Sequence, residues 1–576
     1  TLLEDIARAA PDVCWFQLYV PRKLEVMREI IARVAEAGFN VLVVTLDIPV
    51  GAKRNRELKN GLKLPFSFTP DIVWQSMIHP VWALGQLRQG SPDFVNMLRY
   101  REDPDQGLAS LVSEFTAPGV TLDRIAEIRH AQFTAPPEGC DHEIECSGKF
   151  VLPGLVDSHV HIGNPGQGLS GKVTPATYVF KLWMAHGVTT VRECGALNGL
   201  AWTLDQERKS HDNRITAPRI VTYPVLYYPW LLTEVTNAEE ARAWIEEVSE
   251  HGIKGIKLFG HNPEVMRTVF EEADSRGLRT ACHHTVTWTG RMNALDTCRM
   301  GLTSMEHFLG LAEALSDEGA MQNYPADYVF DDEQMRVLQD AHMWRKVTPG
   351  SSRWRAVMEE MLERDFSIVP TLSSWEPGLD VMRYLWSEWH EEYTLPALWR
   401  FFQPNPMNHW SFYWDWTTAD EIECKQAYPV WMQFVNEYKN LGGRITVGSD
   451  SGFGLKLFGF DTIRELELLQ EAGFHPLEVI DAATRKGAEL LGMDEEIGTV
   501  EPGKKADMLI VDESPLLNFK VLYGTGHMRL ERSTMQVERE KALRYTIKDG
   551  IVYDAQQLLA DVREMVAREK QAEAAS

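Results

Sequence analysis

The stretch VLPGLVDSHVHIG, residues 151–163, decides the fold that we predict for this chain. Its second half reads as a short strand, in which Asp157, His159 and His161 occupy every second position. Side chains at that spacing point to the same face of a strand. Neutral imidazole is the commonest protein ligand for zinc and similar divalent ions, so the two histidines suggest a metal site. Taken alone, the motif is equally well explained by a chance pair of histidines on a half-exposed strand.

Four later strand-like segments each end near another residue suited to such a site. They are GIKGIKLFG (252–260) with Lys257, LRTACHHT (278–285) with His283 and His284, LTSMEHF (302–308) with His307, and RITVGSDSG (444–452) with Asp450. Each has a plain explanation by itself, as a surface lysine, a core histidine or a capping aspartate. Together, with helical stretches between them, the order His-x-His, Lys, His, His, Asp resembles the amidohydrolase superfamily over residues 123–554.

This resemblance implies a (β/α)8 TIM-like barrel of class α/β, whose metal ligands lie on successive strands. It further implies two divalent metal ions, expected to be zinc. His159, His161 and Asp450 would hold one ion, and His283 and His307 the other.

Lys257 is the remaining member of the set, and the resemblance implies that it bridges the two metals as a carbamate formed with carbon dioxide. Lys254 would face the other side of the strand, as an ordinary exposed lysine. On the following strand, His283 comes directly after the apolar triplet 280–282, as in relatives, and is preferred over His284 as the ligand.

The expected activity is hydrolysis of a C–N amide bond in a dipeptide, an N-acyl amino acid or a cyclic amide. A hydroxide shared by the metals would attack the carbonyl, and Asp450 would carry the proton to the leaving nitrogen. The alternatives are a mononuclear deaminase, which would lack the bridging lysine, a fusion that retains a flavin-dependent oxidoreductase, and a non-catalytic scaffold.

The N-terminal segment has a different character. WFQLYV (15–20) and NVLVVTLDIPV (40–50) read as buried strands around a helical stretch, a βαβ rhythm typical of parallel sheet. With ELKNG and GSPDFVN further on, this segment resembles the FMN-dependent 2-hydroxy-acid dehydrogenases, in which the positions of Gln17 and Thr45 contact flavin. The family's SNHGG-type motif with its catalytic histidine is missing downstream, so no base takes the proton of a hydroxy acid. We therefore expect no FMN and no oxidoreductase activity.

The 576 residues are too many for a single core, and the resemblances divide them. The predicted parts are a partial α/β barrel segment of dehydrogenase type (1–122), a small β-sandwich that lacks several strands (123–154 and 497–554), the amidohydrolase barrel (155–496) and a helical tail (555–576). The barrel carries a Trp-rich insertion at about 311–440, because ten of the 18 tryptophans lie between Trp344 and Trp431. Aromatic packing of an inserted helical layer is the favoured explanation, and a lid over an apolar substrate group is the alternative.

The composition narrows the possible partners. A net charge of -25 opposes binding to nucleic acid or to an anionic membrane surface, so we expect a small-molecule substrate. No apolar run of about 18 residues and no signal peptide are found, which favours a cytoplasmic protein. The seven cysteines include no CxxC pair and argue against a thiolate zinc site. The sequence does not decide whether the protein forms a homo-oligomer.

On the predicted second strand of the barrel, Arg192 and Glu193 are expected to form a plain ion pair.

Overall fold

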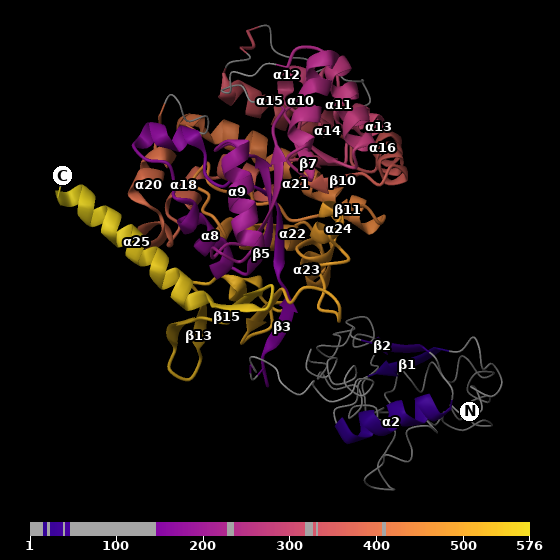
Figure 1. The fold of residues 1–576 in the computed structure, drawn as a ribbon, viewed down its shortest axis with the longest axis vertical. Helices are drawn as coiled ribbons and strands as arrows, with labels where there is room; N and C mark the ends of the chain where they lie inside the picture. Colours follow the sequence, from indigo (N-terminus) through magenta and orange to yellow (C-terminus); the bar gives the residue numbers. More distant parts are fainter. Residues whose placement is uncertain are drawn as a thin grey trace, which may run out of the picture. The chain divides into compact units, whose positions relative to one another are not determined.

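The computed structural model describes residues 15–19, 24–37, 41–45, 144, 146–226, 235–316, 327–329, 332–405 and 411–575 (Figure 1). The chain divides into two compact units, Thr1–Ser147 and Gly148–Ser576. Each unit is described by itself below.

In the first unit, β1 (Trp15–Tyr19), α2 (Leu24–Glu36) and β2 (Val41–Thr45) form a βαβ unit with parallel strands. Met27, Ile30 and Val34 recur at helical spacing and are buried, which gives α2 one apolar face. The βαβ rhythm predicted from the sequence is therefore confirmed. Gln17 and Thr45 lie on the two strands, and their contact with flavin stays a prediction; the later dehydrogenase-like motifs fall outside the described residues.

Eight parallel strands form the centre of the second unit. The first sheet contains β4 (Leu155–Val160), β5 (Val188–Gly195) and β6 (Arg219–Pro224); the second contains β7 (Gly255–Leu258), β8 (Arg279–His283), β9 (Ser304–Glu306), β10 (Ser367–Val369) and β11 (Arg444–Ile445). Within each sheet, the strands are hydrogen-bonded in chain order. The predicted α/β class is confirmed, but the strands are assigned to two sheets and not to the single closed sheet of the prediction.

Hydrogen bonds nevertheless link the two sheets at both of their edges. At one edge, Val225 forms a parallel bridge with Lys257, just beyond the end of β6. At the other, the amide of Ser158 donates to the carbonyl of Val447 at 2.7 Å, so the chain after β11 runs beside β4. The first and last strands of the series are therefore neighbours in space.

Helices alternate with these strands, as the sequence predicts. Those that follow the strands directly or cover them are α8 (Ala176–Ala185), α9 (Leu200–His211), α10 (Ala238–Ser249), α11 (Pro263–Ser275), α12 (Val286–Thr289), α13 (Ala294–Met300), α16 (Ser352–Glu363), α22 (Phe460–Glu471), α23 (Pro476–Ala482) and α24 (Arg485–Leu491). In α10, Asn237 caps the first turn by accepting from the amides of Glu239 and Glu240, both at 3.0 Å. Gly252, where the chain turns toward β7, has a positive φ of 77°, which glycine adopts readily.

The long connections around β10 carry the inserted helices. They are α14 (Leu311–Leu315), α15 (Glu333–Lys346), α17 (Leu372–Trp375), α18 (Val381–Leu385), α19 (His390–Tyr393), α20 (Pro396–Phe402) and α21 (Thr418–Asn440). Trp344, Trp354, Trp375 and Trp431 are fully buried, and the Trp375 ring stacks on Phe308 with centroids 4.0 Å apart. These four tryptophans pack the inserted layer, in agreement with the favoured explanation.

The strand before the HxH motif pairs with strands from the far end of the chain. β3 (Phe150–Pro153), β12 (Met508–Val511), β15 (Leu543–Lys548) and β16 (Ile551–Asp554) form an antiparallel sheet in the order β16-β15-β12-β3. β13 (His527–Glu531) and β14 (Gln536–Glu540) form a separate hairpin, and the long helix α25 (Ala555–Ala575) follows (Figure 1). Among the described residues, no helix has both the length and the apolar character needed to cross a membrane.

Candidate metal centre

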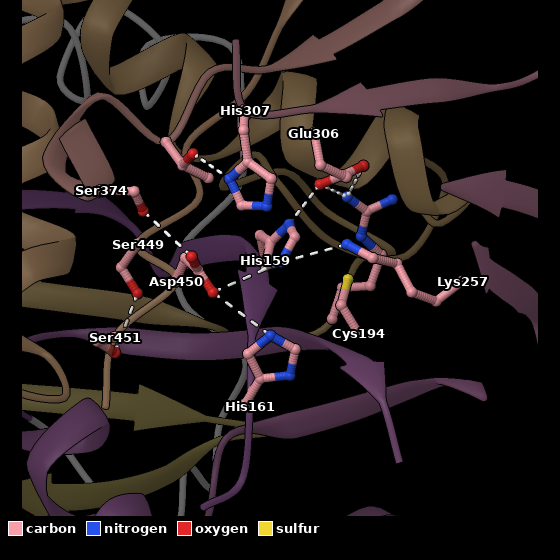
Figure 2. Close-up of polar contacts among 12 residues, drawn as sticks. His159, His161, Cys194, Lys257, Glu306, His307, Ser374, Ser449, Asp450 and Ser451 are labelled. Atoms are coloured by element: carbon pink, nitrogen blue, oxygen red, sulfur yellow. Dashed lines mark hydrogen bonds and ion pairs between the residues drawn. The ribbon is translucent and has the colours of Figure 1, made fainter. Parts of the chain in front are cut away.

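The predicted site residues of the second unit meet at the carboxyl ends of the parallel strands, and Figure 2 shows His159, His161, Lys257, His307 and Asp450 among them. His159 belongs to β4 and Lys257 to β7, and His283 is the last residue of β8. His307 directly follows β9, and Asp450 lies in the loop after β11. Because the carboxyl ends of parallel strands lie at one edge of a sheet, residues far apart in sequence are brought together there.

His159 lies at the centre of the cluster. Its ring centroid is 4.7 Å from that of His307, which in turn is 4.6 Å from that of His283. On its other side, the Nε2 atom of His159 lies 3.4 Å from the Nζ atom of Lys257. Three imidazoles and an amine are therefore within reach of a common centre.

His161 and Asp450 complete the group. The Oδ1 atom of Asp450 lies 3.3 Å from Nε2 of His161 and 3.7 Å from Nε2 of His159. Ligand atoms of His159, His307 and Asp450 all lie within 4.8 Å of one another, a spacing at which they could hold one ion. The structure thus gathers all six predicted ligand positions in one place.

The structure separates the two pairs of residues between which the sequence offered a choice, His283 and His284, and Lys257 and Lys254. His283 lies in the cluster beside Phe259, whereas the Nε2 atom of His284 is 2.9 Å from the Thr297 hydroxyl, away from the other histidines. Lys257 is buried and Lys254 is exposed. The predicted opposite orientation of the two lysines is therefore confirmed, and His283, not His284, stands among the candidate ligands.

Glu306 is a member of the site that the sequence analysis missed. Its Oε2 atom accepts a hydrogen bond from Nδ1 of His159 at 2.5 Å, and both carboxylate oxygens accept from Arg192 at 2.8 Å (Figure 2). This contact fixes the proton on Nδ1 and leaves the Nε2 lone pair of His159 facing the cluster. Cys194 also lies near, since its sulfur, His159 and Glu306 form a second group with donor atoms within 4.8 Å.

The expected ion pair between Arg192 and Glu193 is wrong. The two residues are neighbours on β5 and point to opposite sides of the strand. Arg192 pairs with Glu306, while Glu193 accepts hydrogen bonds from the amides of Ile162 and Ala196 at 2.6 and 3.1 Å. Glu193 therefore holds the turn that carries His161.

Burial keeps three of the histidines in the neutral form, which is the form that binds metals. It lowers the pKa values of His159, His283 and His307 well below the ordinary value. The positive charge of Lys257 acts in the same direction on all three. The cluster thus offers uncharged nitrogen donors.

His161 and Asp450 behave differently from these three. Burial alone would lower the pKa of His161, but its interactions with Asp450 and Glu193 outweigh it and raise that pKa to about 8. For Asp450, burial would raise the pKa, yet the ammonium of Lys456 and the contact with His161 hold it well below its usual range. Asp450 is therefore a carboxylate at neutral pH.

The backbone is strained at the ends of three adjacent strands. His307 (φ 65°), Thr371 (φ 42°) and Asp450 (φ 47°) follow β9, β10 and β11, and each has a left-handed conformation that is unfavourable for residues other than glycine. The Thr371 hydroxyl lies 2.6 Å from Nδ1 of His307 and orients that ring. Such strain concentrates at functional sites, where the surrounding structure holds residues in place.

The donor set fits a zinc-type ion. Neutral imidazoles and a carboxylate are the usual nitrogen and oxygen ligands of Zn²⁺, and the Nε2 atoms of His159 and His161 both face Oδ1 of Asp450. These donors come from different strands of a rigid sheet, which favours a defined coordination geometry.

Comparison with known proteins supports the resemblance predicted for each part of the chain. Residues 1–133 match the FMN-dependent dehydrogenase family, and residues 429–552 match the amidohydrolase family. Over 111 residues the chain is 32% identical to (S)-mandelate dehydrogenase of Pseudomonas putida, an alignment that covers 19% of this chain and 28% of that protein. The chain thus spans less than a third of the length of this curated relative.

Solved structures resemble the larger part. The bottromycin amidohydrolase has a TM-score of 0.51 at 17% identity, over 75% of this chain and 82% of that one. A Xaa-Pro dipeptidase with bound methionine has a TM-score of 0.45 at 18% identity, over 73% and 91%. The first of these likenesses shows an amidohydrolase-like fold. The chain therefore joins a segment that matches the FMN-dependent dehydrogenase family to a larger part that has an amidohydrolase-like fold and matches the amidohydrolase family over residues 429–552.

Proposed function

We propose that the unit Gly148–Ser576 is a metal-dependent hydrolase that cleaves a C–N amide bond in a dipeptide, an N-acyl amino acid or a cyclic amide. The observation that carries the proposal is the convergence of four imidazoles, a buried lysine and an ionised aspartate at the ends of five strands. A structural core rarely gathers so many polar groups without hydrogen-bonding each of them.

The architecture that we propose for this unit is a closed (β/α)8 barrel. The Val225–Lys257 bridge joins one pair of sheet edges, and the bond from Ser158 to Val447 joins the other. These two links support a closed arrangement of the eight strands. A barrel of this kind carries its active site at the carboxyl ends of the strands, where the cluster lies.

We further propose that the site binds two zinc ions. His159, His161 and Asp450 would hold one, and His283 and His307 the other. Lys257 is buried among these ligands, and a carbamylated lysine would offer one carboxylate oxygen to each ion. When bound, the ions would polarise a substrate carbonyl and supply a nucleophile stronger than water at neutral pH.

The residues of the chain would then orient the substrate and move a proton. Asp450 is ionised and its Oδ1 atom faces the histidines, so it is placed to accept a proton from the attacking water. The same carboxyl can return that proton to the leaving nitrogen as the C–N bond breaks. The burial of Lys257 inside the cluster favours this binuclear reaction over a mononuclear deaminase, which has no use for a bridging residue.

The test combines elemental analysis of the full chain with a hydrolysis screen over dipeptides and N-acyl amino acids. We expect close to two zinc ions per chain after expression with sufficient metal, and turnover of at least one substrate class. One ion or none would overturn the binuclear site. Two bound ions without hydrolysis of any amide would overturn the proposed reaction.

A further inference from the structure

Lys456 is a fully buried lysine behind the cluster, and neither the ligand set nor the proposed reaction uses it. Its ammonium donates hydrogen bonds to the Ser374 hydroxyl at 2.7 Å, the Asp450 carbonyl at 2.7 Å and the Ser449 carbonyl at 3.2 Å. An ammonium has three N–H groups, so each of them has an acceptor. Burying a charge is costly, and these three hydrogen bonds offset that cost.

Ser374 connects this ammonium to the side chain of Asp450. The hydroxyl accepts from Lys456 and donates to the Oδ2 atom of Asp450 at 3.2 Å, while the ammonium itself lies 3.9 Å from the same oxygen (Figure 2 shows Ser374 and Asp450). The other oxygen, Oδ1, faces His161 and His159. The two carboxylate oxygens therefore have different neighbours. Lys456 and Ser374 lie at Oδ2, which leaves Oδ1 directed at the histidines.

The same lysine also holds the backbone that presents Asp450. Asp450 has a left-handed φ of 47°, and Lys456 binds its carbonyl and that of the preceding residue. The chain then returns on itself, because the amide of Gly452 donates to the carbonyl of Lys456 at 3.0 Å. One side chain thus ties the start of the loop 449–456 to its end and offsets the backbone strain at Asp450.

We propose that Lys456 is a positioning residue for Asp450: through Ser374 and two backbone carbonyls, it fixes the carboxylate with Oδ1 directed at the histidines. This inference rests on the proposed function in that Asp450 is taken to be a metal ligand. It assigns Lys456 no contact with a metal or a substrate. The competing explanation is that Lys456 only stabilises the fold.

Lys548 offers a matched control for that explanation. It is also fully buried, and its ammonium donates to the Ser210 carbonyl at 2.8 Å and to Asn213 at 2.6 Å, with Asp549 at 3.0 Å. It lies on β15 of the antiparallel sheet, outside the cluster. Lys548→Met removes the same ammonium from a similar environment without touching Asp450.

The experiment compares the zinc affinity of the metal-stripped full chain, measured by competition with a chromophoric chelator, among the wild type, Lys456→Met, Ser374→Ala, the double variant and Lys548→Met. We expect Lys456→Met to weaken zinc binding about 10–100-fold, the usual range for the loss of a group that orients a ligand. Ser374→Ala should weaken it less. The double variant should match Lys456→Met, because both substitutions act on the same oxygen. Lys548→Met should lower the unfolding temperature and leave zinc affinity unchanged.

Each outcome decides between the explanations. A Lys456→Met protein that unfolds at a lower temperature but binds zinc like the wild type would overturn the positioning role. If Lys456→Met does not fold, Ser374→Ala decides, and an unchanged zinc affinity would overturn the proposal. Failure of the proposed function would be seen in the wild type and not in the variants. A wild type that binds no zinc overturns both ideas, whereas a wild type that binds zinc without hydrolysing amides leaves the comparison of affinities to judge Lys456 alone.

Discussion

Two buried networks of charged side chains lie at opposite ends of the parallel strands in the larger unit. At the carboxyl ends, His159 bonds to Glu306, which also pairs with Arg192. At the other end, Arg219 is the first residue of β6 and pairs with Asp507 at 2.5 Å and with Asp549. Both networks are buried and both are built around an arginine.

The networks differ in the groups that surround them. Around Arg219, Asp507 also accepts from the amide of Asp549 at 2.8 Å, and Lys548 has three polar neighbours. Around Glu306, the imidazoles of His159, His283 and His307 lie against one another, with neighbouring ring centroids 4.7 and 4.6 Å apart. Ion pairs bonded among themselves stabilise a fold, whereas several titratable groups gathered at one point favour ligand binding. The Arg219 network is therefore structural, and the Glu306 network is suited to binding.

The largest expected effect is that of Lys257→Ala. Loss of the proposed bridge should remove both metal ions and lower the hydrolysis rate by at least about 1000-fold, since such an electrostatic contribution acts directly on the reacting atoms. Elemental analysis and the rate with a substrate from the screen measure the two effects. Lys254→Ala, on the exposed side of the same segment, should change neither. Unchanged metal content and rate in Lys257→Ala would end the binuclear proposal.

Glu306→Gln should affect both binding and stability. His159 loses the carboxylate that orients it, so zinc affinity should fall about 10–100-fold. Arg192 is left buried without an anion, which should lower the free energy of unfolding by about 3–5 kcal/mol. Chelator competition and denaturant unfolding measure these changes. Stability loss with unchanged zinc affinity would make the Glu306 network as structural as the Arg219 network.

Asp507→Asn tests the opposite end and should affect stability alone. Arg219 keeps Asp549 as a partner, so the free energy of unfolding should fall by about 3 kcal/mol, near the lower limit for breaking a buried pair. Zinc affinity should equal that of the wild type. An altered affinity would mean that the two networks are coupled through the strands, against the separation described above.

The smallest expected effect is the loss of folding stability at low pH that His186 causes. His186 lies just before β5, with Nδ1 2.8 Å from the Leu182 carbonyl, and burial lowers its pKa to about 4. The unfolded chain binds a proton below its ordinary pKa of about 6.5, while the folded chain stays neutral. Stability should therefore fall as the pH drops from about 6.5 toward 4, by at most about 3 kcal/mol from this group.

The measurement is the free energy of unfolding as a function of pH for the wild type and His186→Gln. The variant should be less stable at pH 7 but should lose less stability on acidification. Parallel curves for the two proteins would show that His186 does not contribute to acid sensitivity.

Much of the site was predictable because its residues follow local rules. His159 lies on β4 and His161 directly after it, and their two-residue spacing brings both rings to Asp450 as predicted. The βαβ unit at the N-terminus follows in the same way from two apolar runs and a helical stretch. In each case, the pattern lies within a few residues.

Glu306, Lys456 and Ser374 could not be predicted, because their partners are remote. Glu306 bonds to a histidine 147 residues earlier, and Lys456 reaches a serine 82 residues earlier. Arg192 illustrates the same limit: its neighbour Glu193 suggested an ion pair, but alternation along the strand sends the two side chains apart. The one local signal for Glu306 is its position directly before His307.

The linked edges of the two sheets have a consequence for biosynthesis. Asp157, at the start of the strand series, receives a hydrogen bond from the amide of Ser449, 292 residues later. As the nascent chain leaves the ribosome, its histidines emerge long before the loop that carries Asp450, and β3 waits longer still for β12. The proposed ligand set is therefore complete only after the loop of Asp450 has emerged, and binding of the proposed metals would follow that point.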